Sequence, residues 1–371
     1  MARKLAFTFY EFFAGGGMAR LGLGDGWDCL FANDFDPVKT AAYRANFGAD
    51  HLVEGDVHAL NAEDLPGRAD LAWASSPCQD FSLAGGRTGL AGGKSSAFFG
   101  FWRMMITLRG WGRAPRMIVV ENVGGLLSAN AGADFTALCT ALAAEGYRYG
   151  AVEVDAAMFL PQSRPRVLII ATRDPQVALT PGTTSRAVAT ARDGLSPELR
   201  ARWIDWPTPR QTARNTDLAA LLESDDQADW HDTATTTALI AQMDPLHRAR
   251  LDLALAADER RVAAMFRRTR QGRPRTELRL DGLAGCLRTP GGGSSRQIVG
   301  VIEGGMMRTR LITGREGARL MGLPETYKMP PGVTAGLHLV GDGVAVPVVR
   351  WLAQTILEPA LGTQNTILAA E

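Results

Sequence analysis

Residues 6–23, AFTFYEFFAGGGMARLGL, decide the class of fold. The apolar run 6–13 predicts a buried strand, and the glycines Gly15, Gly16 and Gly17 follow it at once. A helical pattern then begins at Met18. A strand that passes through a glycine turn into a helix lets the backbone turn tightly and approach a bound ligand.

The spacing of these glycines narrows the kind of ligand. A dinucleotide fingerprint would place its third glycine at position 20, which is Arg20. An NAD-dependent oxidoreductase is therefore disfavoured, as it also is by the absence of a persuasive catalytic His or Tyr set. The turn suits a nucleoside cofactor without a pyrophosphate, although a plain strand–helix turn stays open from these residues alone.

The first half of the chain repeats this strand–helix alternation. Further strands are predicted at 27–32, 51–53, 69–74, 117–120, 150–154 and 166–172, and helices at 37–46, 97–110 and 134–145. Such alternation predicts an α/β fold, a Rossmann-like parallel sheet with helices on both faces. Ligands of such sheets bind beyond the carboxyl ends of the strands, so the residues just after each strand are the candidates for function.

Carboxylates follow the second and third predicted strands. Asp34 lies about twenty residues past the glycine turn, where a carboxylate suits the two hydroxyls of a ribose. Phe35 beside it could pack on an adenine. Asp36 directly precedes Pro37 and is the better helix N-cap, which would leave Asp34 free for a ligand. Asp56 could accept from an adenine amino group, although an aspartate in a turn is equally common.

A single cysteine follows the fourth predicted strand, in residues 75–82, SSPCQDFS. The four cysteines of the chain lie far apart, so a zinc site is not expected, and without a secretion signal neither are disulfides. A buried, inert thiol is the commonest fate of a lone cysteine. The polar turn around Cys78 favours a nucleophile instead, which would need a helix N-terminus or nearby cations to form the thiolate.

The fifth predicted strand ends in a charged residue. Glu121 directly follows four apolar residues, a position that is costly for a carboxylate without hydrogen bonds and that suits a group acting as an acid. Arg164 and Arg166 alternate at the entry to the next strand, so they are predicted to share one face. They could bind phosphate or pair with Glu121.

Composition places these features in an ordinary globular protein. The chain has 371 residues, 46% hydrophobic and 21% charged, enough for two domains, and no apolar run approaches the ~20 residues of a membrane span. Residues 217–270 are predicted to be helical. Ten arginines against four acidic residues within 247–279 could offset phosphate charge, although a solvated helix face explains such a block too.

The chain resembles the DNA (cytosine-5)-methyltransferases in an ordered set of motifs. Each motif is weak alone, but their order is highly specific, and together they span roughly residues 6–172 and 308–357. The matching stretches are FAGGG at 13–17, PCQ at 77–79, ENV at 121–123, QSRPR at 162–166, RLITGRE at 310–316 with RLMGLP at 319–324, and GDGVAVP at 341–347.

The resemblance implies S-adenosylmethionine as the methyl donor and a target cytosine that is flipped out of the duplex. Cys78 would attack carbon 6 of the cytosine, Glu121 would hydrogen-bond or protonate nitrogen 3, and Arg166 would contact the base or steady Glu121. Asn122 would hold the local loop, and Arg164 is a weaker catalytic candidate. The positions that match the cofactor-binding residues are Phe13, Gly15, Gly17, Asp34, Phe35, Asp56, Val57, Pro77 and Asp342. Asp342 departs from the asparagine usual there.

The same resemblance implies a domain order: 1–174 catalytic, 175–307 target recognition, and 308–371 the end of the recognition domain and the return to the catalytic one. Arginines in the loop 288–296 could read guanine or contact only phosphate. The predicted DNA-binding residues are Gln79, Ser82, Arg87, Arg288 and Arg296.

Two alternatives share the family's appearance: a tRNA cytosine-5 methyltransferase, and a non-catalytic DNA-binding relative. The large segment between the last two blocks favours duplex DNA over tRNA, and the presence of both Cys78 and Glu121 disfavours a non-catalytic relative. We expect a monomer in the cytoplasm of a bacterium or of a phage-infected cell, with double-stranded DNA as its partner and no membrane association. The resemblance leaves open a cognate restriction endonuclease, and it does not give the DNA word.

Overall fold

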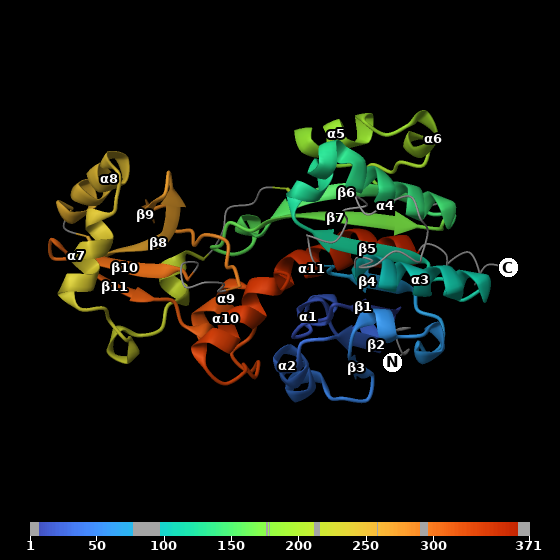
Figure 1. Ribbon diagram of the computed structural model, residues 1–371, viewed down its shortest axis with the longest axis horizontal. Helices are drawn as coiled ribbons and strands as arrows, with labels where there is room; N and C mark the ends of the chain where they lie inside the picture. The colour runs from blue at the N-terminus through green and yellow to red at the C-terminus, as the bar shows by residue number, and fades with distance from the viewer. Residues whose placement is uncertain are drawn as a thin grey trace. The chain divides into compact units, whose positions relative to one another are not determined.

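The computed structural model describes residues 7–76, 97–175, 177, 179–210, 216–257, 259–289 and 296–362. The chain divides into two compact units (Figure 1). The first unit comprises residues 1–154, 165–211 and 348–371, and the second comprises 155–164 and 212–347. The predicted assignment of residues 175–307 to target recognition stays a prediction, because these units are defined by packing alone.

The first unit contains a seven-stranded sheet in the order β3-β2-β1-β4-β5-β7-β6. Strands β1 to β5 are parallel neighbours, and β7 runs antiparallel to β5. Each predicted strand of the first half is present. The strands are β1 (Phe7–Phe12), β2 (Trp27–Asp34), β3 (Leu52–Glu54), β4 (Leu71–Ala74), β5 (Met117–Asn122), β6 (Arg148–Asp155) and β7 (Pro165–Thr172).

The expectation of a fully parallel sheet was wrong at β7. A parallel neighbour needs a crossover connection of about a dozen residues or more. Only residues 156–164 connect β6 to β7, and they contain no helix longer than the 3₁₀ turn Ala156–Met158. The short connection is visible in the sequence, and it explains why the sheet is mixed.

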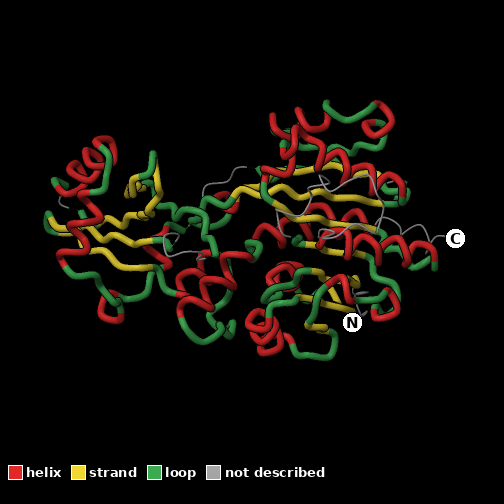
Figure 2. The backbone as a smooth tube through the Cα atoms, in the orientation of Figure 1, coloured by secondary structure: helices red, strands yellow, loops and turns green. Residues whose placement is uncertain are grey.

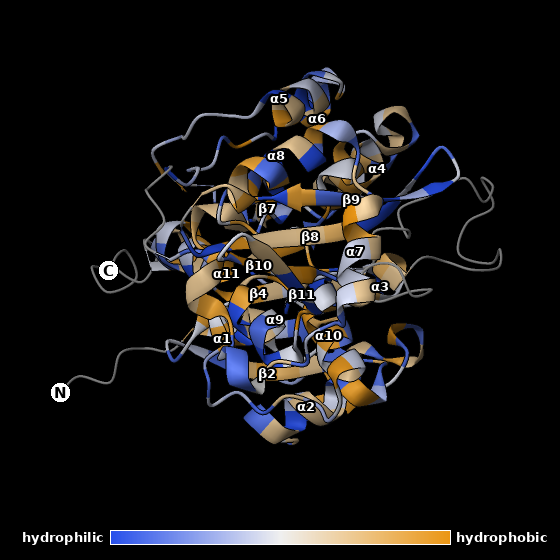
Figure 3. Ribbon diagram, turned by 90° about the vertical axis from the view of Figure 1, so that its left-hand side faces the viewer, coloured by the Kyte–Doolittle hydropathy of each residue, from blue (hydrophilic) through white to orange (hydrophobic). Residues whose placement is uncertain are grey.

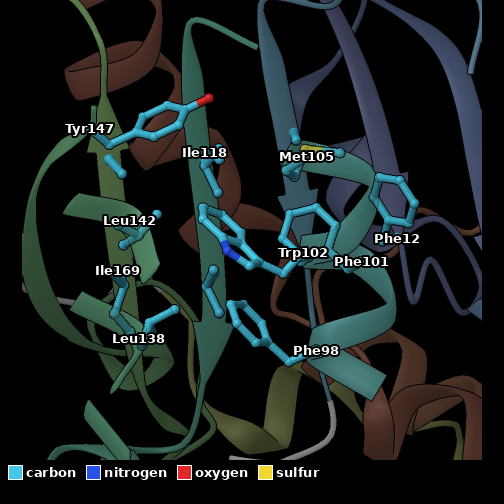
Figure 4. Packing of buried hydrophobic residues seen from close by; sticks show 14 of the residues in the cluster. Phe12, Phe98, Phe101, Trp102, Met105, Ile118, Leu138, Leu142, Tyr147 and Ile169 are labelled. Carbon is cyan, nitrogen blue, oxygen red and sulfur yellow. The ribbon is translucent and has the colours of Figure 1, made fainter. Parts of the chain in front are cut away.

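Helices lie on both faces of this sheet, which confirms the predicted fold class. Tyr10 and Phe12 face a buried cluster. Among the side chains drawn in Figure 4, α3 contributes Phe98, Phe101, Trp102 and Met105, and α4 contributes Leu138 and Leu142. Glu11, between Tyr10 and Phe12, points to the other face and contacts α1. The helices are α1 (Met18–Leu23), α2 (Pro37–Phe47), α3 (Ala97–Gly110), α4 (Ala133–Ala144), α5 (Arg186–Asp193), α6 (Pro197–Arg200) and α11 (Val346–Leu352), which continues as a π-helix (Ala353–Leu357).

The second unit contains a separate four-stranded antiparallel sheet in the order β11-β10-β8-β9 (Figure 2). This sheet has its own buried apolar cluster. Hydrophobic residues run along β10 and the middle of β8 (Figure 3). Its elements are α7 (Thr233–Ala241), α8 (Pro245–Leu255), β8 (Arg261–Arg270), β9 (Arg273–Arg279), β10 (Ile298–Glu303), β11 (Met306–Leu311), α9 (Gly314–Leu320) and α10 (Val333–Asp342).

The prediction that residues 217–270 are helical was wrong from Arg261 onward, where β8 begins. Ala263, Ala264 and Met265 are all buried, because β8 is an inner strand covered on both faces. A strand buried on both faces loses the alternation that would distinguish it from a helix. The signal in the sequence is the two-residue turn Gln271–Gly272, where both residues have positive φ, as a tight hairpin requires.

One helical stretch, Val333–Gly362, is long and apolar enough by length and composition to cross a membrane. Of its most apolar window, 56% is buried inside the protein. Core helices of globular proteins have the same length and composition.

Candidate active site

The glycine turn after β1 is built from backbone conformations that favour glycine. Phe13, Gly15 and Gly17 all have positive φ. A Cβ at Gly17 would stand 2.5 Å from a ring carbon of Phe47 and 3.0 Å from one of Tyr43. The turn therefore packs directly on α2, and a larger residue at position 17 would displace it.

Asp34, at the end of β2, holds this turn in place. Its Oδ2 accepts from the backbone N–H of Gly15 at 2.8 Å, and its Oδ1 accepts from that of Asp36 at 2.9 Å. Burial raises the pKa of Asp34, and these two N–H donors oppose that rise. The expectation that Asp34 is left free was therefore wrong, although Asp36 does cap α2 by accepting from Val38 and Lys39. A carboxylate oxygen has a second lone pair, so Asp34 can still accept from a ribose hydroxyl.

Phe35, Asp56 and Val57 lie at the same carboxyl edge in different environments. The Phe35 side chain is 69% exposed, unusual for a phenylalanine and suited to stacking on a planar ligand. Val57 is buried in the apolar cluster. Asp56 Oδ1 accepts from the backbone N–H of His58 at 2.9 Å and caps the 3₁₀ turn Val57–Ala59. Asp56 therefore makes a turn contact, which was one of the two interpretations of this residue from the sequence.

An ion pair closes the end of β5. Arg166 Nε lies 2.9 Å from Glu121 Oε1, and only 15% and 8% of the two side chains are exposed. The pairing follows from the register, because Asn122 on β5 stands opposite Val167 on β7. A largely buried carboxylate and guanidinium at a strand end form a site that can donate to or stabilise a polar ligand.

Asn122 ties this acid to the segment that leads to the cysteine. Its Nδ2 donates to the carbonyl of Ser76 at 3.1 Å, and its Oδ1 accepts from the N–H of Val123 at 2.9 Å. Ser76 is buried at the end of β4, two positions before Cys78. This hydrogen bond therefore holds the chain that leaves β4 next to Asn122, the residue that follows Glu121. The predicted site residues outside the described part of the chain are Pro77, Cys78, Gln79, Ser82 and Arg87.

Arg164 was expected to share a face with Arg166, and this was wrong. Strand β7 begins at Pro165, so strand alternation does not reach Arg164. Its guanidinium is buried in the second unit. It donates to the carbonyls of Leu287, Gly341 and Gly343 at 2.8, 2.8 and 2.6 Å. These contacts join two segments that are far apart in sequence, and a catalytic role for Arg164 stays an untested prediction.

We expect Arg164→Met to lower the free energy of unfolding by about 2–5 kcal/mol, because two buried carbonyls and one partly buried carbonyl would lose their donor. Urea denaturation followed by tryptophan fluorescence measures this. The matched control is Arg248→Met, which removes an exposed pair with Asp252 and should cost less than about 1 kcal/mol. Equal losses in the two variants would contradict the structural task assigned to Arg164.

Asp342 ends α10 next to the loop predicted to read DNA. The Thr289 hydroxyl donates to Asp342 Oδ1. At the preceding Gly341 the two segments come so close that a Cβ would stand 2.6 Å from the Thr289 nitrogen. Arg288 is exposed, and Arg296 Nη2 donates to the Thr334 hydroxyl at 2.5 Å. Asp342 therefore contacts the start of this loop.

We expect Asp342→Asn to retain methyl transfer within about threefold, because the asparagine oxygen can accept the same hydrogen bond from Thr289. Initial rates at varied S-adenosylmethionine concentration measure the effect. Thr289→Val is the companion variant, since it removes the donor and keeps the shape. A large change in the apparent affinity for the cofactor in Asp342→Asn would show that the carboxylate charge matters.

A buried acid in the middle of β1 was not singled out from the sequence. Glu11 is 1% exposed, its Oε2 has no hydrogen-bond partner among the described residues, and Oε1 accepts weakly from the Arg20 N–H at 3.4 Å. Burial raises the pKa of Glu11 from 4.5 to about 8, against the opposing effect of Arg20. A single charged residue inside the apolar run 6–13 is the signal that could have identified it.

The raised pKa of Glu11 predicts a pH dependence of stability. The folded chain keeps the proton up to about pH 8, whereas the unfolded chain releases it near 4.5, so stability should fall as the pH rises between these values. Glu11→Gln should flatten that fall. Melting temperatures from pH 5 to 9 for the wild type and the variant measure it, and parallel curves would contradict the assignment.

Comparison with solved structures identifies the class of fold. The chain matches the Dnmt2 methyltransferase of S. pombe with a TM-score of 0.62 at 18% identity, over 95% of this chain and 99% of that one. It matches a DNMT2 mutant of Spodoptera frugiperda with a TM-score of 0.63 at 15% identity, over 94% and 99%. This likeness shows that the chain has the fold of these methyltransferases.

Comparison of sequences identifies the family. The model of the C-5 cytosine-specific DNA methylases matches residues 7–358. The Type II methyltransferase M.BsuFI of Bacillus subtilis is 26% identical over 99% of this chain and 76% of its own length. The Type II methyltransferase M.HhaI of Haemophilus parahaemolyticus is 25% identical over 94% and 93%. The chain belongs to the C-5 cytosine-specific DNA methylase family, which confirms the resemblance.

Proposed function

We propose that this enzyme methylates carbon 5 of a cytosine within a specific word of duplex DNA, with Cys78 as the nucleophile and Glu121 as the acid. Carbon 5 is too poor a nucleophile to take a methyl group until carbon 6 has been attacked. The thiolate of Cys78 adds to carbon 6 of the flipped base while Glu121 hydrogen-bonds or protonates nitrogen 3. After methylation, a base removes the proton at carbon 5 and Cys78 is eliminated.

The observation that carries this proposal is the ion pair of Glu121 with Arg166 at the carboxyl edge of the sheet. Arg166 orients the carboxyl and places a positive charge beside it. The hydrogen bond from Asn122 to Ser76 supports the proposal further, because it anchors the chain two residues before Cys78. An acid therefore lies at the end of β5, and the chain that leads to the proposed nucleophile is anchored at the end of the neighbouring strand β4.

The glycine turn fits the adenosine part of S-adenosylmethionine. The positive φ values of Gly15 and Gly17 let the backbone approach a ligand, Asp34 can accept from ribose, and the exposed ring of Phe35 can stack on adenine. Phe13, Asp56, Val57, Pro77 and Asp342 complete the proposed set. The sulfonium of the bound cofactor supplies an electrophilic methyl group, and these residues bind and orient it.

We assign target recognition to residues 175–307, with Arg288 and Arg296 as candidates for base contacts. Arginine can bind guanine through two hydrogen bonds in the major groove. Gln79, Ser82 and Arg87, next to the nucleophile in sequence, are the remaining proposed DNA contacts. The relatives are bacterial Type II methyltransferases, which supports an enzyme of the bacterial cytoplasm. That the enzyme is a monomer is part of the same proposal. A cognate restriction endonuclease is a further proposed partner.

Methyl transfer from radiolabelled S-adenosylmethionine to duplex DNA and to tRNA tests this function directly. We expect incorporation into DNA alone. Bisulfite sequencing of a host that expresses the chain would then give the methylated word. Incorporation into tRNA with none into DNA would favour the tRNA alternative, and incorporation into neither would favour a non-catalytic relative.

A further inference from the structure

The hairpin of β8 and β9 ends in a concentration of positive charge. Residues 267–274 are all exposed, and none of them is acidic. We call residues 267–275 the arginine tip. Its arginines are Arg267, Arg268, Arg270, Arg273 and Arg275.

The strand register sets like charges against each other in the arginine tip. Arg268 on β8 stands directly opposite Arg275 on β9, and Arg270 stands directly opposite Arg273. Like charges in directly opposed positions destabilise a sheet. The carboxylate of Glu277 lies 3.5 Å from Arg268 and 3.1 Å from Arg270, so one acid serves two guanidinium groups. The arginines of the tip therefore repel one another, and a bound anion would relieve this repulsion.

The arginine tip stands on a firmly held base. Ala263, Ala264 and Met265 of β8 are buried in the sheet, and β8 pairs with β10 on its other side. The turn at the far end is closed by Gln271 and Gly272 with φ of 51° and 72°. A short two-residue turn between paired strands holds the arginines in a fixed array rather than on a long loop.

Protection of a sheet edge explains only part of this array. Edge strands often carry charged residues that prevent pairing with another chain. That function accounts for Arg273 and Arg275, because β9 is the edge strand. The pairing of β8 with β10 ends at Met265, so among the described residues the arginines of β8 in the tip border a free edge as well. Edge protection needs only some charged residues, and it does not account for five arginines with no acidic residue between positions 267 and 275.

We propose that the arginine tip binds the phosphate backbone of duplex DNA without reading sequence, as a contact separate from the loop 288–296. Guanidinium groups suit phosphate oxygens, and each neutralised phosphate releases counterions. The contact rests on the proposed function, since it takes DNA to be the substrate. It adds affinity for any duplex and leaves the choice of DNA word to other residues.

The test compares Arg270→Gln/Arg273→Gln with the charge-conserving control Arg270→Lys/Arg273→Lys. Binding of the full chain to duplexes with and without the methylated word is measured by fluorescence anisotropy at several salt concentrations. We expect the glutamine variant to bind both duplexes more weakly by the same factor, roughly tenfold or more at 0.1 M salt. Its slope of log K against log[salt] should be shallower by about 2. The lysine control should keep the wild-type slope.

The same variants distinguish the contact from a purely structural role. The glutamine variant loses one like-charge pair and the exposed ion pair of Arg270 with Glu277, which are small and opposite effects. The melting temperature should therefore change little, and weaker binding could not be attributed to unfolding. At saturating DNA the rate of methylation should be unchanged. An unchanged salt slope, or a loss confined to the methylated word, would overturn the inference while DNA methylation persists. Absence of DNA methylation in the wild type would refute the proposed function instead, and tighter binding to RNA than to duplex DNA would assign the tip to RNA.

Discussion

Replacing Cys78 by alanine is expected to lower the rate of methyl transfer by a factor on the order of 10⁴ or more, because no other group can activate carbon 5 of cytosine. Single-turnover incorporation of labelled methyl groups into duplex DNA measures this loss. Binding of DNA and cofactor should persist, since the thiol acts after both are bound. The variant should therefore form a complex that does not react.

Cys29 provides a matched control for this experiment. Burial raises the pKa of the Cys29 thiol to about 12, so it holds almost no thiolate at neutral pH. We expect Cys29→Ala to keep most of the methyl transfer rate. Full turnover by Cys78→Ala, or a comparable loss in both variants, would remove Cys78 from the mechanism.

The second large effect concerns Glu121. Glu121→Gln keeps the shape of the side chain, but the amide can neither carry a negative charge nor give up a proton. We expect the rate of methyl transfer to fall by about 10²–10⁴. The substitution should also lower stability, because the largely buried Arg166 loses its anionic partner. Adding Arg166→Met should restore part of the stability and none of the activity. Thermal denaturation and single-turnover rates on the same preparations separate the two effects.

An active Glu121→Gln enzyme would contradict the role given to this acid. So would a double variant that recovered activity together with stability, because the loss would then have come from an unpaired charge alone. DNA binding of each variant serves as the control for folding.

The sequence predicts those features that depend on local patterns. The helix Ala97–Gly110 has the predicted bounds, since its apolar residues recur at helical spacing and glycine ends it. Asp36 caps α2 as predicted, because a proline at the first position of a helix marks the residue before it as the N-cap. The pairing of Glu121 with Arg166 was one of two expected outcomes, and it follows from the strand ends that meet at one edge of the sheet.

The features that were missed depend on tertiary contacts. The carbonyls that engage Arg164 come from residues 287, 341 and 343, and no local pattern brings them to position 164. Asp34 is engaged by the N–H of Gly15 only once the glycine turn has folded against β2. Likewise, β8 resembles a helix in sequence because both of its faces are buried.

Covalent trapping tests most directly whether Cys78 attacks the cytosine that Glu121 activates. The substrate is a duplex that carries 5-fluorocytosine at the methylated position, where fluorine cannot be removed as a proton and elimination is blocked. We expect an adduct with wild-type enzyme and S-adenosylmethionine that survives a denaturing gel and maps by mass spectrometry to Cys78. Cys78→Ala should form none. An adduct at another residue, or no adduct from an enzyme that methylates the normal duplex, would contradict the mechanism.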